Sequence, residues 1–258
     1  MVPCTRMPPP HDSGEPLPWS HSLMEAAELG LFMLSACVFT VLLYHPHSPA
    51  LAWIPNPTLR RLLMGIAMGL TAVGIIQCPW GRASGAHFNP AITLTFLRLG
   101  KIGPRDAAFY ILFQFLGGIA GVGLSWLLLG APLASPQVNF AVTIPGPLGP
   151  AAAFAAEAFM AALLMAVVLI TSNRPALAPY TTYCMGCLIA SYILLFAPIS
   201  GFSINPARTF ASAVFAHLWT SIWIYFTAPL LGMFFSAELY LRLAGKQHYF
   251  HHRHLTQR

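Results

Sequence analysis

Long apolar segments dominate the pattern of hydrophobic and polar positions along the chain. A helix that crosses a bilayer needs roughly 20 apolar residues. Six segments reach that length, and they span residues 22–44, 59–77, 106–129, 151–171, 180–197 and 219–243. Two shorter apolar stretches cover residues 88–97 and 206–215. Because roughly ten residues cannot cross a bilayer, we expect re-entrant half-helices there.

Composition supports a membrane protein with several spans. Of the 258 residues, 57 % are hydrophobic and 8 % are charged, whereas soluble domains average about 25 % charged residues. So few charges could not cover the surface of a soluble fold, and the apolar content is too high for disorder. The sequence predicts an all-α membrane protein embedded in a lipid bilayer.

The second half of the chain repeats the first. Each half carries the same tripeptide at the start of its short apolar stretch, and the six residues are Asn89, Pro90, Ala91, Asn205, Pro206 and Ala207. Tyr110, Gln114 and Gly117 after the first copy correspond to Tyr225, Pro229 and Gly232 after the second. Three spans in each half are an odd number, so the second copy must enter the membrane inverted.

This repeat divides the chain into five parts. We expect a cytoplasmic tail at residues 1–21, a first repeat at 22–129 and a linker outside the cytoplasm at 130–150. The second repeat covers 151–243, and a cytoplasmic tail covers 244–258. With both ends inside, cytoplasmic segments hold ten basic residues, while Arg60 and Arg61 lie outside. The bias follows the positive-inside rule and agrees with both chain ends in the cytoplasm. We expect an integral protein of the plasma (cell inner) membrane.

The chemistry of the two tripeptides suits a path for neutral molecules. Proline is favoured at the first helical position and asparagine at the N-cap before it. In an inverted repeat the two half-helices point their N-termini at each other near the bilayer centre. Each end carries about half a positive charge, which disfavours cations and protons in a narrow pore. The side-chain amides of Asn89 and Asn205 can donate to a passing oxygen.

These features resemble the major intrinsic proteins, the aquaporin and aquaglyceroporin family. The matching segments are residues 84–93 around the first tripeptide and 203–208 around the second, with the two membrane glutamates Glu28 and Glu157. The resemblance implies six tilted helices with two half-helices, a pore in each protomer and a homotetramer. It also implies that both glutamates accept backbone N–H groups of the re-entrant loops. The pore carbonyls would belong to Gly85, Ala86, His87, Gly201, Phe202 and Ser203.

The same resemblance locates a selectivity constriction. Arg208, a cation inside a membrane segment, marks a pathway by default, and Phe202 and Ile193 fall at two further positions. The fourth constriction position lies on the second span. It is Met68 if residues 69–71 are aligned with the family's second helix, and Gly69 if one counts back from Asn89. We prefer Met68. One charged donor against three apolar walls suits a solute with hydroxyls on one edge and carbon on the other.

The predicted function is therefore passive flow of water and small neutral solutes, such as glycerol-like polyols, urea or metalloid hydroxides, with protons and ions excluded. A strictly water-selective channel is the alternative, since Thr209 and Tyr225 resemble the water channels. A coupled transporter and a purely structural membrane protein are less favoured hypotheses. We expect no enzyme activity, cofactor, metal site or nucleic-acid partner. The tail histidines, His248, His251, His252 and His254, are expected in a disordered basic segment.

Overall fold

The computed structural model describes the backbone of residues 19–250 and the side chains of residues 19–243. Within that part of the chain the fold is helical, with six helices long and apolar enough to span a membrane. They are α1 (Trp19–Tyr44), α3 (Pro57–Gln77), α6 (Pro104–Leu129), α8 (Gly149–Ser172), α9 (Thr181–Ser200) and α11 (Ile222–Phe250). The prediction of an all-α membrane protein with six spans is confirmed.

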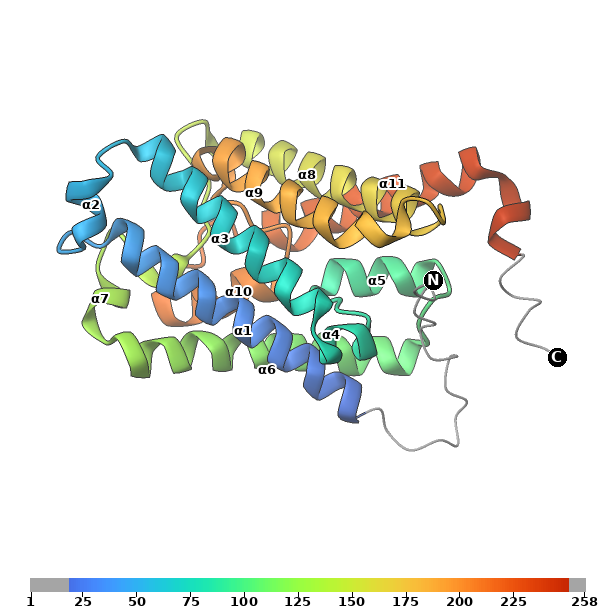
Figure 1. Ribbon diagram of the computed structural model, residues 1–258, viewed down its shortest axis with the longest axis horizontal. Helices are drawn as coiled ribbons and strands as arrows, with labels where there is room; N and C mark the ends of the chain where they lie inside the picture. The colour runs from blue at the N-terminus through green and yellow to red at the C-terminus, as the bar shows by residue number, and fades with distance from the viewer. Residues whose placement is uncertain (1–18, 251–258) are drawn as a thin grey trace.

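Two short helices lie between the long ones. They are α5 (Pro90–Arg98) and α10 (Pro206–Ala216), with 9 and 11 residues. Each begins at the proline of its tripeptide because the preceding asparagine caps the helix. Figure 1 shows α5 and α10 in opposite halves of the molecule, enclosed by the long helices. Both predicted half-helices are present.

The inverted repeat is visible in how the long helices pair. Helix α1 packs along α6, α8 packs along α11 in the same way, and α3 packs against α9 between the halves. At Gly117 of α6 an added Cβ would lie 2.1 Å from Ala26 O. At Gly232 of α11 it would lie 2.1 Å from Ala158 O. The two helix pairs therefore approach closely at equivalent places, where only glycine fits.

The segment between the repeats is more structured than a linker. It contains α7 (Ala131–Ala134) and the 3₁₀ turn η1 (Asn139–Ala141). Leu133, Val138 and Phe140 are buried and belong to the main core cluster. Remaining short elements are α2 (Pro49–Trp53), α4 (Pro79–Ser84) and η2 (Ala178–Tyr180). The segment 130–150 thus connects the two repeats and also packs onto the helices through these buried residues.

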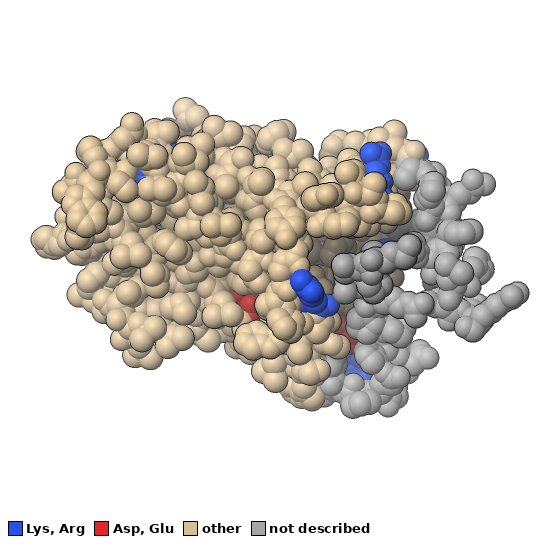
Figure 2. All heavy atoms as spheres, in the orientation of Figure 1, with Lys and Arg blue, Asp and Glu red and all other residues tan. Residues whose placement is uncertain are grey.

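The outer surface is suited to lipid. Figure 2 shows a face that is almost entirely uncharged, with Lys and Arg gathered mainly toward one end of the molecule. Large apolar side chains on the helices point outward, and Leu127 is 85 % exposed. In water such a surface would aggregate, whereas in a bilayer the lipid chains cover it.

Helix α11 extends beyond the predicted end of the last span at residue 243. Its backbone remains helical to Phe250, so the first part of the predicted C-terminal tail is helical. His248 lies in this helical stretch. His251, His252 and His254 lie outside the described residues.

Candidate functional site

Two asparagines cap the half-helices with the same geometry. Asn89 Oδ1 accepts from Ala91 N at 2.9 Å, and Asn205 Oδ1 accepts from Ala207 N at 3.0 Å. The second cap also accepts from Arg208 N at 3.2 Å. Each cap satisfies an N–H group that the first turn of a helix leaves unpaired.

The amide nitrogens of the same asparagines join the two repeats. Asn89 Nδ2 donates to Ile204 O at 2.7 Å, and Asn205 Nδ2 donates to Phe88 O at 2.8 Å. These reciprocal hydrogen bonds bring the N-termini of α5 and α10 together in the interior of the protein. An amide NH₂ has two hydrogens, so each asparagine retains one donor for another oxygen.

The loop before each half-helix has a backbone conformation that differs from those of helices and strands. Gly85, Ala86 and Phe88 have positive φ angles of 92°, 49° and 29°. In the second loop Gly201, Phe202 and Ile204 have φ angles of 77°, 55° and 47°. The matching pattern, with His87 and Ser203 at the same place in each loop, keeps the chain extended while turning successive peptide groups. Within the described residues, no hydrogen bond is recorded to the carbonyls of residues 85–87 or 201–203. These carbonyls remain available as acceptors.

A buried carboxylate holds the second of these loops. Glu157 accepts from Ser203 N at 3.0 Å, from Ile204 N at 2.5 Å and from Ser200 Oγ at 2.6 Å. Each N–H group left without a hydrogen-bond partner in a bilayer costs about 2–7 kcal/mol of free energy. Glu157 therefore holds the extended loop in place.

In the first loop the equivalent acceptor is Glu25 and not the predicted Glu28. Glu25 accepts from His87 N at 2.8 Å and from Phe88 N at 2.6 Å. Glu28, one turn later on α1, accepts a hydrogen bond from Ser84 Oγ at 2.7 Å and from no other described residue. The glycine contacts of the helix pairs agree, because Ala26 directly follows Glu25 as Ala158 follows Glu157. Both acids lie in one apolar run, so the sequence could have suggested Glu25 as well, but it did not show which one faces the loop.

Tyrosines from α6 and α11 hold the start of each loop. Tyr110 Oη donates to Ser84 O at 2.8 Å, and Tyr225 Oη donates to Ser200 O at 2.6 Å. Gln114, one turn after Tyr110, donates from Nε2 to Glu25 Oε2 at 2.7 Å. The repeated residues of α6 and α11 thus support the two loops.

The structure distinguishes the two residues considered on α3. An added Cβ at Gly69 would lie 2.5 Å from Gly186 O of α9, so Gly69 faces the contact between two helix backbones. Met68 is instead 2 % exposed in the main core cluster, with Sδ 3.8 Å from Ser35 Oγ of α1. Only Met68 presents a side chain that could line a path.

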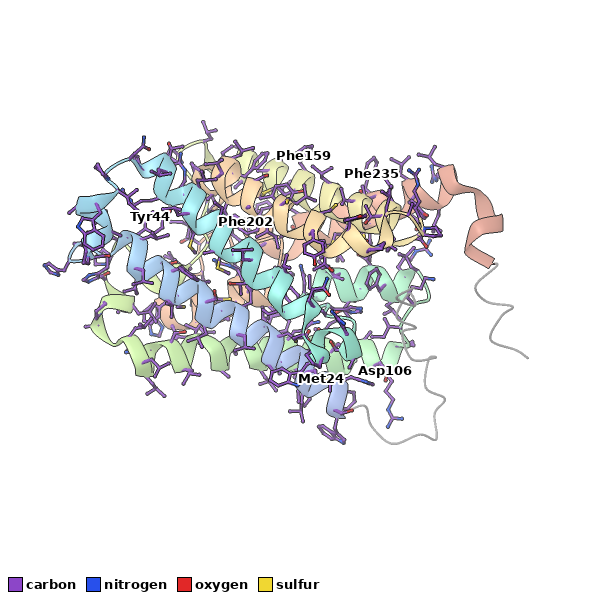
Figure 3. All side chains as sticks on the ribbon, in the orientation of Figure 1. Met24, Tyr44, Asp106, Phe159, Phe202 and Phe235 are labelled. Carbon is purple, nitrogen blue, oxygen red and sulfur yellow. The ribbon has the colours of Figure 1, made fainter. Side chains whose placement is uncertain are left out.

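The other proposed constriction residues lie in the interior as well. Phe202 packs against Tyr192 with ring centroids 6.1 Å apart, and Ile193 follows Tyr192 on α9. Figure 3 shows Phe202 in the middle of the molecule among the long helices. Arg208 in the first turn of α10 is 8 % exposed, and its Nη1 donates to Ala141 O at 2.8 Å. Sequence reasoning missed this contact from the segment between the repeats.

Comparison with known proteins agrees with this geometry. A family model described as Major intrinsic protein matches residues 21–240. A probable NIP-type aquaporin of Nicotiana alata is 33 % identical over 161 residues, which cover 62 % of this chain and 58 % of that protein. The aligned part is thus less than two thirds of that relative. Glycerol uptake facilitator protein-like 6 of Lactiplantibacillus plantarum is 33 % identical over 189 residues, covering 68 % of this chain and 82 % of that protein.

Among solved structures, the aquaglyceroporin from Plasmodium falciparum has a TM-score of 0.76. The match covers 89 % of this chain and 98 % of that chain at 17 % identity. At this identity the likeness concerns the fold. The family match over residues 21–240 shows that the chain belongs to the major intrinsic protein family.

Proposed function

We propose that the protein is a passive channel for water and small neutral solutes. The observation that carries this proposal is the meeting of two capped half-helices, with Asn89 and Asn205 each bonded to the opposite loop. This arrangement places two amide donors side by side in the interior, next to loop carbonyls without recorded partners. A neutral molecule that both donates and accepts hydrogen bonds could replace its hydrogen bonds to water with hydrogen bonds to these amides and carbonyls.

The same arrangement favours exclusion of protons and ions. The half-helix N-termini each carry about half a positive charge, and they face each other. Arg208 adds a full charge beside the second N-terminus, and its only recorded side-chain hydrogen bond within the described residues is to Ala141 O. The remaining guanidinium N–H groups suit the oxygens of a solute. A cation at this place would meet repulsion from three directions.

The constriction residues favour small polyols, urea or metalloid hydroxides in addition to water. Arg208 offers hydrogen bonds on one side, and Phe202, Ile193 and Met68 offer apolar surface on the others. A solute with carbon on one edge fits such surroundings better than water alone does. The matching glycerol uptake facilitator-like protein supports this assignment. A strictly water-selective channel is the second candidate, because Ile193 and Met68 are bulky and could close the path to polyols.

We further propose a homotetramer in the plasma membrane with both chain ends in the cytoplasm. The orientation is supported by basic residues on connections at one end of the helices, among them Arg82, Arg98 and Arg174, against Arg60 and Arg61 at the other. Exposed apolar helix faces provide surface for contacts with other protomers and with lipid.

Stopped-flow light scattering on proteoliposomes tests the function directly. We expect water, glycerol and urea permeabilities well above those of protein-free vesicles, without proton flux in a pH-sensitive dye assay. Water permeability without glycerol or urea permeability would select the strictly water-selective channel. Uptake driven by a pH gradient would instead indicate a coupled transporter.

A further inference from the structure

The fourth residue after each capping asparagine is a threonine that braces the preceding loop. Thr93 Oγ1 lies 3.1 Å from His87 Nδ1, and Thr209 Oγ1 lies 2.5 Å from Ser203 Oγ. Both threonines are buried, at 0 % and 1 % exposure. The two half-helices are thus tied to their own loops in the same way.

The repeats differ in what else holds these threonines. Thr93 accepts from Gln114 Nε2 of the spanning helix α6 at 3.0 Å. The equivalent residue of α11 is Pro229, which has no side-chain donor. Thr143 takes over this role, with Oγ1 2.8 Å from Thr209 Oγ1. The second half-helix is therefore held by the segment between the repeats, where the first is held by a membrane helix.

That segment also holds the arginine next to Thr209. Ala141 O accepts from Arg208 Nη1, two residues before Thr143. Asn139, Phe140 and Ala141 have φ angles of 40°, 54° and 51°, which L residues rarely adopt. The ring of Phe140 fixes this turn, with centroids 5.1 Å from Trp126 and 5.9 Å from Phe215. Residues 139–143 thus contact two adjacent residues of α10. The carbonyl of Ala141 accepts from Arg208, and the hydroxyl of Thr143 bonds to Thr209.

We propose that Thr143 is a positioning residue for Arg208 and thereby sets the largest solute that the channel admits. Its hydroxyl ties residues 139–143 to the first turn of α10, and so fixes the carbonyl of Ala141 relative to the guanidinium. Without this tie, the carbonyl moves away and Arg208 loses its one recorded side-chain partner. The guanidinium is then free to move from its present position, and the opening widens. This inference rests on the proposed channel function.

Permeability ratios test the inference. In proteoliposomes, Thr143→Val should raise the ratio of glycerol to water permeability by roughly three- to tenfold, the size expected for loss of one hydrogen bond. Thr143→Ser keeps the hydroxyl and should restore the parental ratio. Thr209→Val also removes the contact with Ser203, so the double variant Thr143→Val with Thr209→Val is compared with Thr209→Val. The double variant should change the ratio no more than Thr209→Val alone, because that variant already lacks the contact with Thr143. Thr95→Val is the matched control, since Thr95 is buried in α5 and its hydroxyl, among the described side chains, donates to Ala91 O of its own helix alone.

Hydrogen exchange of residues 139–143 provides a readout that does not depend on transport. It should be faster in Thr143→Val than in Thr95→Val, and parental in Thr143→Ser. Absence of water and glycerol flux in the parent protein, together with faster exchange in Thr143→Val, would refute the proposed channel and retain the tie. A parental glycerol-to-water ratio in a conducting Thr143→Val protein would overturn the positioning role, and so would unchanged exchange.

Discussion

Two glutamates one turn apart on α1 have different environments. Glu25 accepts two backbone N–H groups and the side-chain amide of Gln114. Glu28 accepts a single hydroxyl, and its Oε2 has no hydrogen-bond partner within the described residues. Glu28 lies three residues after Glu25, and the equivalent position in the second repeat, three residues after Glu157, is Met160. Among the described residues, Glu28 thus contacts the first loop through the Ser84 hydroxyl, whereas Glu25 accepts its backbone N–H groups directly.

Substitution of each glutamate by glutamine should separate these roles. Glu25→Gln should destabilise the protein by about 1–3 kcal/mol or more, because an NH₂ group would then face backbone N–H donors. Glu28→Gln and Glu28→Met should cost less, since the one hydroxyl can find another acceptor. Thermal unfolding in detergent, followed by tryptophan fluorescence, measures the difference. Equal losses for Glu25→Gln and Glu28→Gln would contradict the assignment.

Arg208 should contribute most to the barrier against charge. Arg208→Val should raise proton or cation leak on the order of tenfold, equivalent to a barrier lower by about 1.4 kcal/mol. Water flux should persist, because the asparagine amides and the loop carbonyls are unchanged. Dye-based proton flux and stopped-flow water flux on the same vesicles provide the comparison. Loss of water flux with no added leak would argue against this role.

The side chain of Ile193 should limit the size of the solute. Ile193→Gly should raise glycerol permeability severalfold, on the order of a barrier lower by 1 kcal/mol, because it removes one apolar wall. Leu195→Gly on the same helix is the matched control: Leu195 is 60 % exposed, and the cost of glycine in the helix is the same. Equal glycerol permeability in the two variants would show that Ile193 does not line the path.

At the scale of elements, the close helix pairs depend on glycine. Gly117→Ala and Gly232→Ala should each destabilise the protein by roughly 1–3 kcal/mol, because the new methyl group would strike a neighbouring backbone. Gly74→Ala on α3 is the control, since nothing lies within 4 Å of its added Cβ. That control should be neutral or slightly stabilising, because alanine favours helices. Thermal unfolding of the three variants tests the prediction, and equal stability of all three would refute it.

Sequence reasoning located most elements because their signals are local. Apolar runs long enough to span a bilayer gave the six spans, and Asn-Pro marked the starts of α5 and α10. The fold of residues 130–150 was missed because its buried residues, such as Leu133 and Phe140, come singly and without a period. The choice between Glu25 and Glu28 depends on the rotation of α1, which an apolar pattern on all sides does not fix. Gly69 and Met68 could be separated only once the contact of α3 with α9 was known.

At the scale of the whole molecule, the reciprocal asparagine bonds have a consequence for biosynthesis. The amide of Asn89 is bonded to a carbonyl that follows 115 residues later in the chain. When the first repeat leaves the ribosome, that acceptor has not been made. The first half therefore enters the bilayer with an unsatisfied polar group at its centre, and the second half supplies the partner only on arrival. We therefore expect the two halves to join late, after the second half has been inserted, and the first half alone to be less stable than the whole protein.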